Sequence, residues 1–236
     1  MYYPYYSYGG GMDYFWLLVI PAFILSLIAQ AAVNSTYRRY SKIRTAQGVT
    51  GDRVARMILD ANGLQAVRIE RISGNLTDNY DPRTNVINLS DSTYGNDSVA
   101  AAGVAAHEAG HAVQYAEGYG PIKLRAAIIP VTQIGATLSW PAILLGLLMS
   151  LDFLITLGIL LFSLSVVFQL VTLPVEFNAS RRAITVLDGY GVLDSEELGG
   201  AKKVLRAAAW TYIAALAVSL ANLLRLIAMF GGRKRN

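Results

Sequence analysis

Four long apolar runs alternate with polar segments along this chain. Each run has the roughly 20 predominantly apolar residues that a helix needs to cross a bilayer. We therefore predict transmembrane helices over residues 14–33, 126–149, 153–173 and 207–230. Between the first and second runs lies a mixed polar stretch that is long enough for one small folded domain. The pattern predicts a mainly α membrane protein with about four transmembrane helices and a small α+β domain.

The polar stretch begins with a helix pattern and continues with strand patterns. Thr50 to Gly63 reads as a helix whose expected buried face consists of Val54, Met57, Ile58 and Ala61. Alternating positions between turn residues then predict a small antiparallel sheet with strands at 66–72, 76–80 and 86–90. An edge of this sheet could hold an extended peptide, or the sheet could simply cover a neighbouring helix. Both interpretations stay open at this point.

A second helix is predicted directly after the sheet. Asp97 or Ser98 can cap it, residues 99–116 are mostly small and apolar, and Gly118 stops it. It contains His107-Glu108-Ala109-Gly110-His111, which holds both histidines of the chain. Positions i and i+4 share a helix face, so the two imidazoles can bind one metal ion. This is the H-E-x-x-H arrangement of zinc hydrolases, in which the glutamate is the general base.

The third ligand of such a site has to be a carboxylate. Catalytic zinc usually takes three protein ligands, and the chain has no cysteine and no further histidine. Glu176 is well placed, because the two predicted spans after His111 return the chain to the same side of the membrane. Weaker candidates lie in a segment that resembles a helix start: Asp194, Glu196 and Glu197.

Composition supports the membrane assignment. Hydrophobic residues make up 54% of the chain and charged residues 15%, against about 25% charged in an average soluble domain. The net charge of +4 does not indicate nucleic acid, because the basic residues lie beside the apolar runs rather than in one patch. Contact with anionic lipid head groups explains them better.

The basic residues also predict an orientation. No Lys or Arg precedes the first run, several follow it, and the 150–152 loop carries none. By the positive-inside rule, the polar domain is cytoplasmic. The basic tail at 233–235 disagrees with four full crossings, so we leave open whether the last run is partly buried or re-entrant. The start, 1–13, is rich in tyrosine and glycine and fits an aromatic belt and a disordered tail equally well.

Two segments resemble the YugP-like neutral zinc metallopeptidases, a family of bacterial membrane proteins. They are residues 104–112 around the motif and 173–183 around Glu176, and similarity at 50–63 and 76–83 extends the resemblance over nearly the whole chain. The resemblance implies one zinc ion per chain with His107, His111 and Glu176 as its ligands. It implies Glu108 as the catalytic base.

The segment around Glu176 is also similar to the Glu-x-x-Ala-Asp pattern of the HtpX and prenyl-protein (CAAX) membrane proteases. Ser180 stands where that pattern has Asp. A hydroxyl cannot offer the same charge, so no role that requires a charge at this position carries over.

We therefore expect a membrane-embedded zinc endopeptidase, gluzincin-like with H-E-x-x-H plus Glu, in the bacterial plasma membrane with its active site on the cytoplasmic side. Expected partners are the lipid bilayer and peptide or membrane-protein substrates, not nucleic acid; the oligomeric state is not predicted. Arg181 and Arg182 could donate to the oxyanion or support a ligand. The alternative is a non-hydrolytic zinc sensor or transporter, although a transporter needs ionisable residues along its spans.

These expectations divide the chain into six segments. The first three are the tail, the first transmembrane helix and the cytoplasmic metallopeptidase domain, at 1–13, 14–33 and 34–121. The motif helix of this zincin-like domain leads into the second span. The others are the second and third transmembrane helices, the third-ligand segment with a linking helix, and the fourth hydrophobic helix with the basic tail, at 122–175, 176–206 and 207–236.

Overall fold

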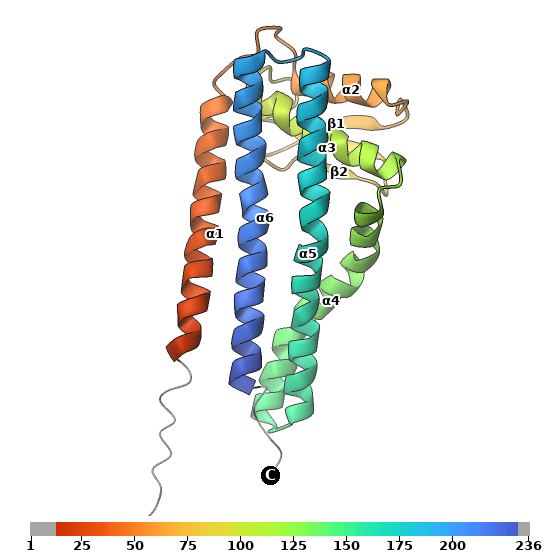
Figure 1. The fold of residues 1–236 in the computed structure, drawn as a ribbon. Coiled ribbons are helices and arrows are strands. Elements are labelled where there is room, and N and C mark those ends of the chain that lie inside the picture. The colour runs from red at the N-terminus through yellow and green to blue at the C-terminus, as the bar shows by residue number, and fades with distance from the viewer. Residues whose placement is uncertain (1–12, 231–236) are drawn as a thin grey trace, which may run out of the picture. The chain divides into compact units, whose positions relative to one another are not determined.

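The computed structural model describes residues 13–230, so the tyrosine-rich start up to residue 12 and the basic tail from 231 lie outside the described residues. Helices dominate the described part (Figure 1). They are α1 (Asp13–Tyr40), α2 (Gly51–Ala61), α3 (Val99–Ala116), α4 (Gly120–Leu148), α5 (Asp152–Gly189) and α6 (Ser195–Phe230). The strands are β1 (Arg68–Ile72), β2 (Asn79–Asp81) and β3 (Val86–Ser90).

Four of these helices, α1, α4, α5 and α6, are long and apolar enough to cross a membrane. Each covers one of the predicted apolar runs to within one residue and extends beyond it at one end or at both. The third run, for example, ends at Leu173, whereas α5 passes through Pro174 and continues to Gly189, just before the turn at Gly191, where φ is +62°. Between 176 and 206 the described chain therefore contains the end of α5 and the start of α6, and no separate linking helix.

The chain forms two compact units, and the four long helices each contribute to both. The first unit combines Met1–Ile28, Ala127–Val171 and Tyr212–Asn236. The second combines Ala29–Ala126 and Thr172–Thr211. All of the H-E-x-x-H residues and Glu176 belong to the second unit, which is the unit that matters for the site.

Small residues allow α4 and α5 to approach closely within the first unit. A Cβ atom at Gly158 would lie 2.8 Å from the carbonyl oxygen of Ser139, and one at Gly146 would lie 2.8 Å from the backbone nitrogen of Ile155. Such close backbone approaches are typical of helix pairs in membranes. In the same unit, the guanidinium carbon of Arg225 lies 4.1 Å from the ring centroid of Trp16, so this cation in an apolar run has an aromatic partner.

The second unit has a hydrophobic core built around α3. Ser98 caps this helix, since its hydroxyl accepts a hydrogen bond from the backbone N–H of Ala101 at 3.2 Å. Most residues of α3 are buried, as expected of a helix that is apolar on all sides. The α6 helix begins with a capping box, in which Asp194 accepts from the backbone of Glu197 and the Glu197 side chain accepts from the backbone of Asp194.

The buried face of α2 differs from the predicted one. Val54 and Ile58 are buried as expected, but they are joined by Ala55 and Leu59, whereas Met57 is half-buried and Ala61 exposed. The apolar residues of α2 form two overlapping stripes. Packing against α3 selects the stripe that contains Leu59, because burying a leucine removes more apolar surface from water than burying an alanine.

The sheet is mixed, so the prediction of an antiparallel sheet was wrong for one strand pair. The order is β1-β3-β2, with β2 antiparallel and β1 parallel to β3. A tight turn that ends at Asn85, where φ is +56°, joins β2 to β3. Because that turn fixes β2 on one side of β3, β1 pairs with the other side. The central strand β3 is largely buried, as this position requires.

The close contact between α6 and the end of α1 gives a test of this packing. A Cβ atom at Gly200 would lie 2.6 Å from a ring carbon of the buried Tyr40, whereas the space around Gly199 is open. We expect Gly200→Ala to destabilise the protein, because overpacking costs about 1–3 kcal/mol and outweighs the gain in helix propensity of about 0.5–1 kcal/mol.

Thermal unfolding in detergent measures the effect. The adjacent Gly199→Ala is the matched control and should leave the melting temperature unchanged or raise it. Equal melting temperatures for the two variants would contradict the packing described above.

Candidate metal centre

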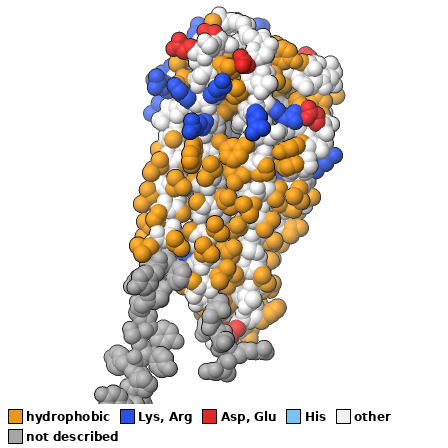
Figure 2. All heavy atoms as spheres, in the orientation of Figure 1, with side chains coloured by type: hydrophobic (Ala, Val, Ile, Leu, Met, Phe, Trp, Pro, Cys, Tyr) orange, Lys and Arg blue, Asp and Glu red, His pale blue; other side chains and the backbone are white. Residues whose placement is uncertain are grey.

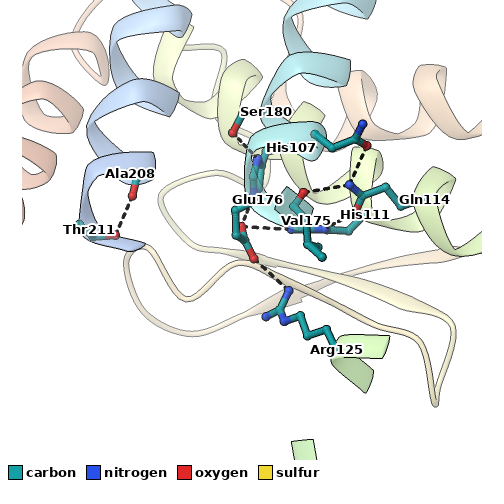
Figure 3. A network of polar contacts seen from close by, with 10 residues as sticks. His107, His111, Gln114, Arg125, Val175, Glu176, Ser180, Ala208 and Thr211 are labelled. Carbon is teal, nitrogen blue, oxygen red and sulfur yellow. Dashed lines mark hydrogen bonds and ion pairs between the residues drawn. The ribbon is translucent and has the colours of Figure 1, made fainter. Parts of the chain in front are cut away.

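The two histidines lie one turn apart on α3 and share a face of that helix. Their ring centroids are 4.7 Å apart in an edge-to-face arrangement. Glu176 of α5 meets this face, and its Oε2 atom lies 3.2 Å from Nε2 of His107 and 3.5 Å from Nε2 of His111 (Figure 3). One ligand atom from each residue lies within 4.8 Å of the others, and all three side chains are largely buried. The fold therefore brings together two residues of one helix and a third from far along the chain.

Small residues make this approach of α5 to α3 possible. Gly110 lies between the histidines, and a Cβ atom at this position would come within 3.1 Å of the carbonyl oxygen of Ala179. Ala179 is itself fully buried and three residues beyond Glu176. Larger side chains at either position would separate the helices, so the H-E-A-G-H form of the motif supports the placement of the carboxylate.

The geometry and the donor atoms fit a zinc ion. Zinc prefers four tetrahedral ligands with bonds of about 2.0–2.2 Å, which places the ligand atoms roughly 3.3–3.6 Å apart. The two distances from Oε2 of Glu176 to the histidine nitrogens agree closely with this spacing. Two imidazoles and one carboxylate also match the ligand types of catalytic zinc sites that keep one position for water. The three residues together could hold zinc.

Gln114 fixes which nitrogen of His111 faces this centre. The Gln114 amide nitrogen donates to the carbonyl oxygen of Val175 at 2.9 Å and to Oδ1 of Asn178 at 2.8 Å. Its Oε1 atom is therefore the atom that faces Nδ1 of His111, at 3.0 Å. An amide oxygen can only accept, so Nδ1 carries the hydrogen and Nε2 keeps its lone pair for the metal.

Ser180 has the same position with respect to the other histidine. Its hydroxyl lies 3.2 Å from Nδ1 of His107, one helical turn after Glu176 on α5. The group that accepts a hydrogen bond from the outer nitrogen of a metal-binding histidine need not be charged. Ser180 stands where the Glu-x-x-Ala-Asp pattern has an aspartate. Its hydroxyl therefore orients the imidazole of His107 without the negative charge that an aspartate would bring.

The two oxygens of the Glu176 carboxylate have different partners, and Arg125 is the partner of one of them. Its Nη1 atom donates to Oε1 of Glu176 at 2.9 Å, whereas the other oxygen faces the histidines (Figure 3). The Nε atom of Arg125 is buried and has no hydrogen-bond partner among residues 13–230. Arg125, at the start of α4, is therefore the ion-pair partner of Glu176, and neither Arg181 nor Arg182 pairs with this carboxylate in the described part of the chain.

Glu108 is almost fully buried beside the candidate metal ligands and makes no hydrogen bond to another described residue. Burial raises the pKa of this carboxyl group above its usual value, although the charges of both histidines act in the opposite direction. Burial alone would lower the pKa of His111, but its hydrogen bond to Glu176 and the negative charges nearby outweigh this and raise it.

The remaining predicted site residues lie elsewhere in the second unit. Arg182 donates to Oδ1 of Asn178 at 2.8 Å and to Glu117 at 2.6 Å, so its support of a ligand is indirect, through Asn178 and Gln114. Arg181 lines a pocket of about 300 Å³ together with Gly110. The three weaker third-ligand candidates belong to the start of α6, where Asp194 and Glu197 form the capping box.

Comparison with known proteins places this centre in a family. Residues 15–231 match the family described as "Putative neutral zinc metallopeptidase". The chain belongs to this family. It is 47% identical over 223 residues to the "Putative membrane protease YugP" of Bacillus subtilis (strain 168), which covers 94% of this chain and 99% of the relative. No solved structure matches the chain significantly. The resemblance found in the sequence is thus confirmed at the level of the family.

Sequence reasoning missed three neighbours of the candidate ligands. Gln114 lies three residues after His111 and Ser180 lies four residues after Glu176, so both share a helix face with a predicted ligand. That spacing could have identified them. Arg125 has no such signal, because it contacts Glu176 from another helix, 51 positions away.

The contact between Arg125 and Glu176 yields a prediction about metal affinity. We expect Arg125→Met to weaken zinc binding by about 10–100-fold, the usual effect of removing a hydrogen-bond partner of a metal ligand. Without the guanidinium, the carboxylate loses the donor that holds one oxygen away from the metal. Lys123→Met is the matched control, since it removes a cation two residues away that makes no contact with Glu176. Competition with a chromogenic chelator measures both affinities, and equal affinities for the two variants would contradict this role.

Proposed function

We propose that this protein is a membrane-embedded zinc endopeptidase that hydrolyses peptide bonds near the cytoplasmic surface of the membrane, with one zinc ion per chain. The observation that carries the proposal is the convergence of His107, His111 and Glu176 beside the unpaired carboxylate of Glu108. Membership of a zinc metallopeptidase family supports it. The site is of the H-E-x-x-H plus Glu type, on a helix that leads into α4.

Zinc bound by these three residues would supply a Lewis acid that activates water and polarises the peptide carbonyl at neutral pH. Glu108 acts as the general base, which accepts the proton of the attacking water and then passes it to the leaving amine. Its raised pKa suits both steps, because a group that takes up and releases a proton works best when its pKa is near the operating pH. Arg125 and Glu176 stay paired throughout.

The edge of the sheet nearest to α3 offers a place for the substrate. β2 is an edge strand, and Tyr80 in it packs edge-to-face against Tyr115 of α3, with 5.7 Å between ring centroids. We infer that an extended peptide adds to the free edge of β2, so that its backbone supplies most of the affinity. This inference corresponds to the first interpretation left open by the sequence, in which an edge of the sheet holds an extended peptide.

The unpaired Glu108 also favours hydrolysis over the alternative of a zinc sensor or transporter. A site that only binds metal needs its ligands and their hydrogen-bond partners. It has no use for a further buried carboxylate, which burial makes costly to ionise. In a hydrolase this same carboxylate is the required proton acceptor.

The central test separates metal binding from catalysis. We expect Glu108→Gln to keep about one zinc per chain but to reduce peptide hydrolysis by about 10²–10⁴-fold, the usual contribution of a general base. Glu176→Gln should lower zinc content and hydrolysis together, because it removes a ligand charge. Metal analysis and digestion of a peptide library by the purified protein measure the two properties. Full hydrolysis by Glu108→Gln would refute the mechanism, and absence of hydrolysis in the parent protein would favour the sensor or transporter.

The side of the membrane can be tested separately. The basic residues that follow the first apolar run and their absence from the 150–152 loop support a cytoplasmic site. A reporter enzyme that is active only outside the cytoplasm should therefore be inactive when fused after Gly63 and active when fused after Ser150. A fluorescent protein that matures only in the cytoplasm should show the reverse pattern. Opposite results from both reporters would overturn the orientation.

A further inference from the structure

A hollow lies in the second unit, away from the candidate metal ligands, between the end of α1 and the start of α6. It has a volume of about 470 Å³, within the size range of small-molecule sites. α1 contributes a face with helical spacing, which includes Ala32, Ser35 and Arg39, and α6 contributes another. The α6 face consists of Lys203, Arg206, Ala207 and Trp210.

The charge of this hollow is entirely positive. Arg39, Lys203 and Arg206 line it, and no acidic side chain does. None of these three cations forms an ion pair with a carboxylate in the described part of the chain. The guanidinium carbon of Arg39 instead lies 5.6 Å from the ring centroid of Tyr40, which restricts its orientation. Three unpaired cations together with the hydroxyl group of Thr36 match the acceptor oxygens of a phosphate, whereas the Ser35 hydroxyl donates to the carbonyl oxygen of Ala32.

Apolar residues occupy another part of the same hollow. Ala32 and Ala207 line it beside Trp210, which is 44% exposed. In both helices the apolar run meets the polar segment at this point, since the run in α1 ends near Val33 and that in α6 starts near Ala207. Tryptophan is enriched where proteins meet the membrane–water interface. A free anion has no need of such an apolar border, whereas a lipid has an acyl region next to its phosphate.

The hollow is rigid on one side. Tyr40 is buried, and its ring lies so close to Gly200 that no side chain fits between them. A second hollow, lined by Arg38 and Lys42, shares Ser35 and Arg39 with the first, so the positive surface continues along α1. Figure 2 shows Lys and Arg side chains gathered on the visible face, outside the broad apolar surface.

We propose that this hollow is a binding site for the phosphate head group of an anionic glycerophospholipid. The phosphate contacts Arg39, Lys203 and Arg206, and the glycerol backbone and first acyl carbons lie against Ala207 and Trp210. Basic pockets between membrane helices bind anionic lipids in this way. The site is distinct from the metal centre and does not depend on the peptidase activity.

The test uses the purified full-length protein in a neutral detergent at about 150 mM salt, where long-range attraction is screened. Short-chain phosphatidylglycerol, short-chain phosphatidylcholine and inorganic phosphate are titrated separately, and the apparent Kd is obtained from the thermal shift. We expect phosphatidylglycerol to bind at least about tenfold more tightly than phosphatidylcholine. Binding of inorganic phosphate as tightly as phosphatidylglycerol would overturn the assignment to a lipid.

Two variants with the same net charge locate the site. Lys203→Gln with Arg206→Gln should weaken phosphatidylglycerol binding by about tenfold or more. Arg53→Gln with Lys202→Gln is the matched control, because it removes two exposed cations outside the hollow, and it should retain parent affinity. Equal weakening in both double variants would show diffuse attraction and would overturn the proposal.

A third variant keeps every charge and fills the space. Ser35→Trp should reduce phosphatidylglycerol affinity about as much as the loss of the two cations, because the side chain occupies the hollow. Parent affinity in this variant would overturn the proposal, since binding would then depend on charge alone. All substituted residues are exposed, and helix content measured by circular dichroism checks that each variant is folded.

Discussion

A carboxylate that is buried among helices stays ionised only if cations and hydrogen-bond donors surround it. Glu176 is buried in α5, and the second unit supplies its partners from two other helices. Arg125 of α4 holds one oxygen, and the histidines of α3 face the other. This single group therefore ties α5 to α3 and α4, through contacts that span 51 to 69 positions of the sequence. Removing any partner would leave a buried charge without compensation. The site therefore forms only when α3, α4 and α5 pack together.

The short distances in the site depend on small residues at the helix contacts. Gly110 lets α3 lie against the backbone of α5 at Ala179, and at Gly103, which faces Ala201 of α6, a Cβ atom would make an ordinary van der Waals contact. An alanine-rich helix is a good helix former, but it buries little surface per residue. Here the small side chains of α3 are useful, because larger ones would hold the Glu176 carboxylate too far from the histidines. The sequence of α3 thus combines two candidate metal ligands with a surface that other helices can approach.

Much of the fold could be predicted because it depends on local sequence. Length and hydrophobicity identify the four long helices, and the caps and stops around residues 99–116 define α3. The errors arise where tertiary contacts decide. The stripe of α2 that becomes buried depends on its fit to α3, and the parallel pairing of β1 depends on which edge of β3 is free. Neither choice is encoded within the segment itself.

The site shows the same division between local and distant information. His107, Glu108 and His111 lie within one turn and a half of a helix, so spacing alone groups them. Glu176 could be proposed only indirectly, from the absence of other ligands, the return of the chain across two spans and the family resemblance of its segment. Arg125 could not be proposed at all, because its contact with Glu176 depends on where α4 begins relative to α5. Residues whose roles come from a neighbour on the same helix are readable in sequence, whereas a partner from another helix becomes visible only when the helices are placed together.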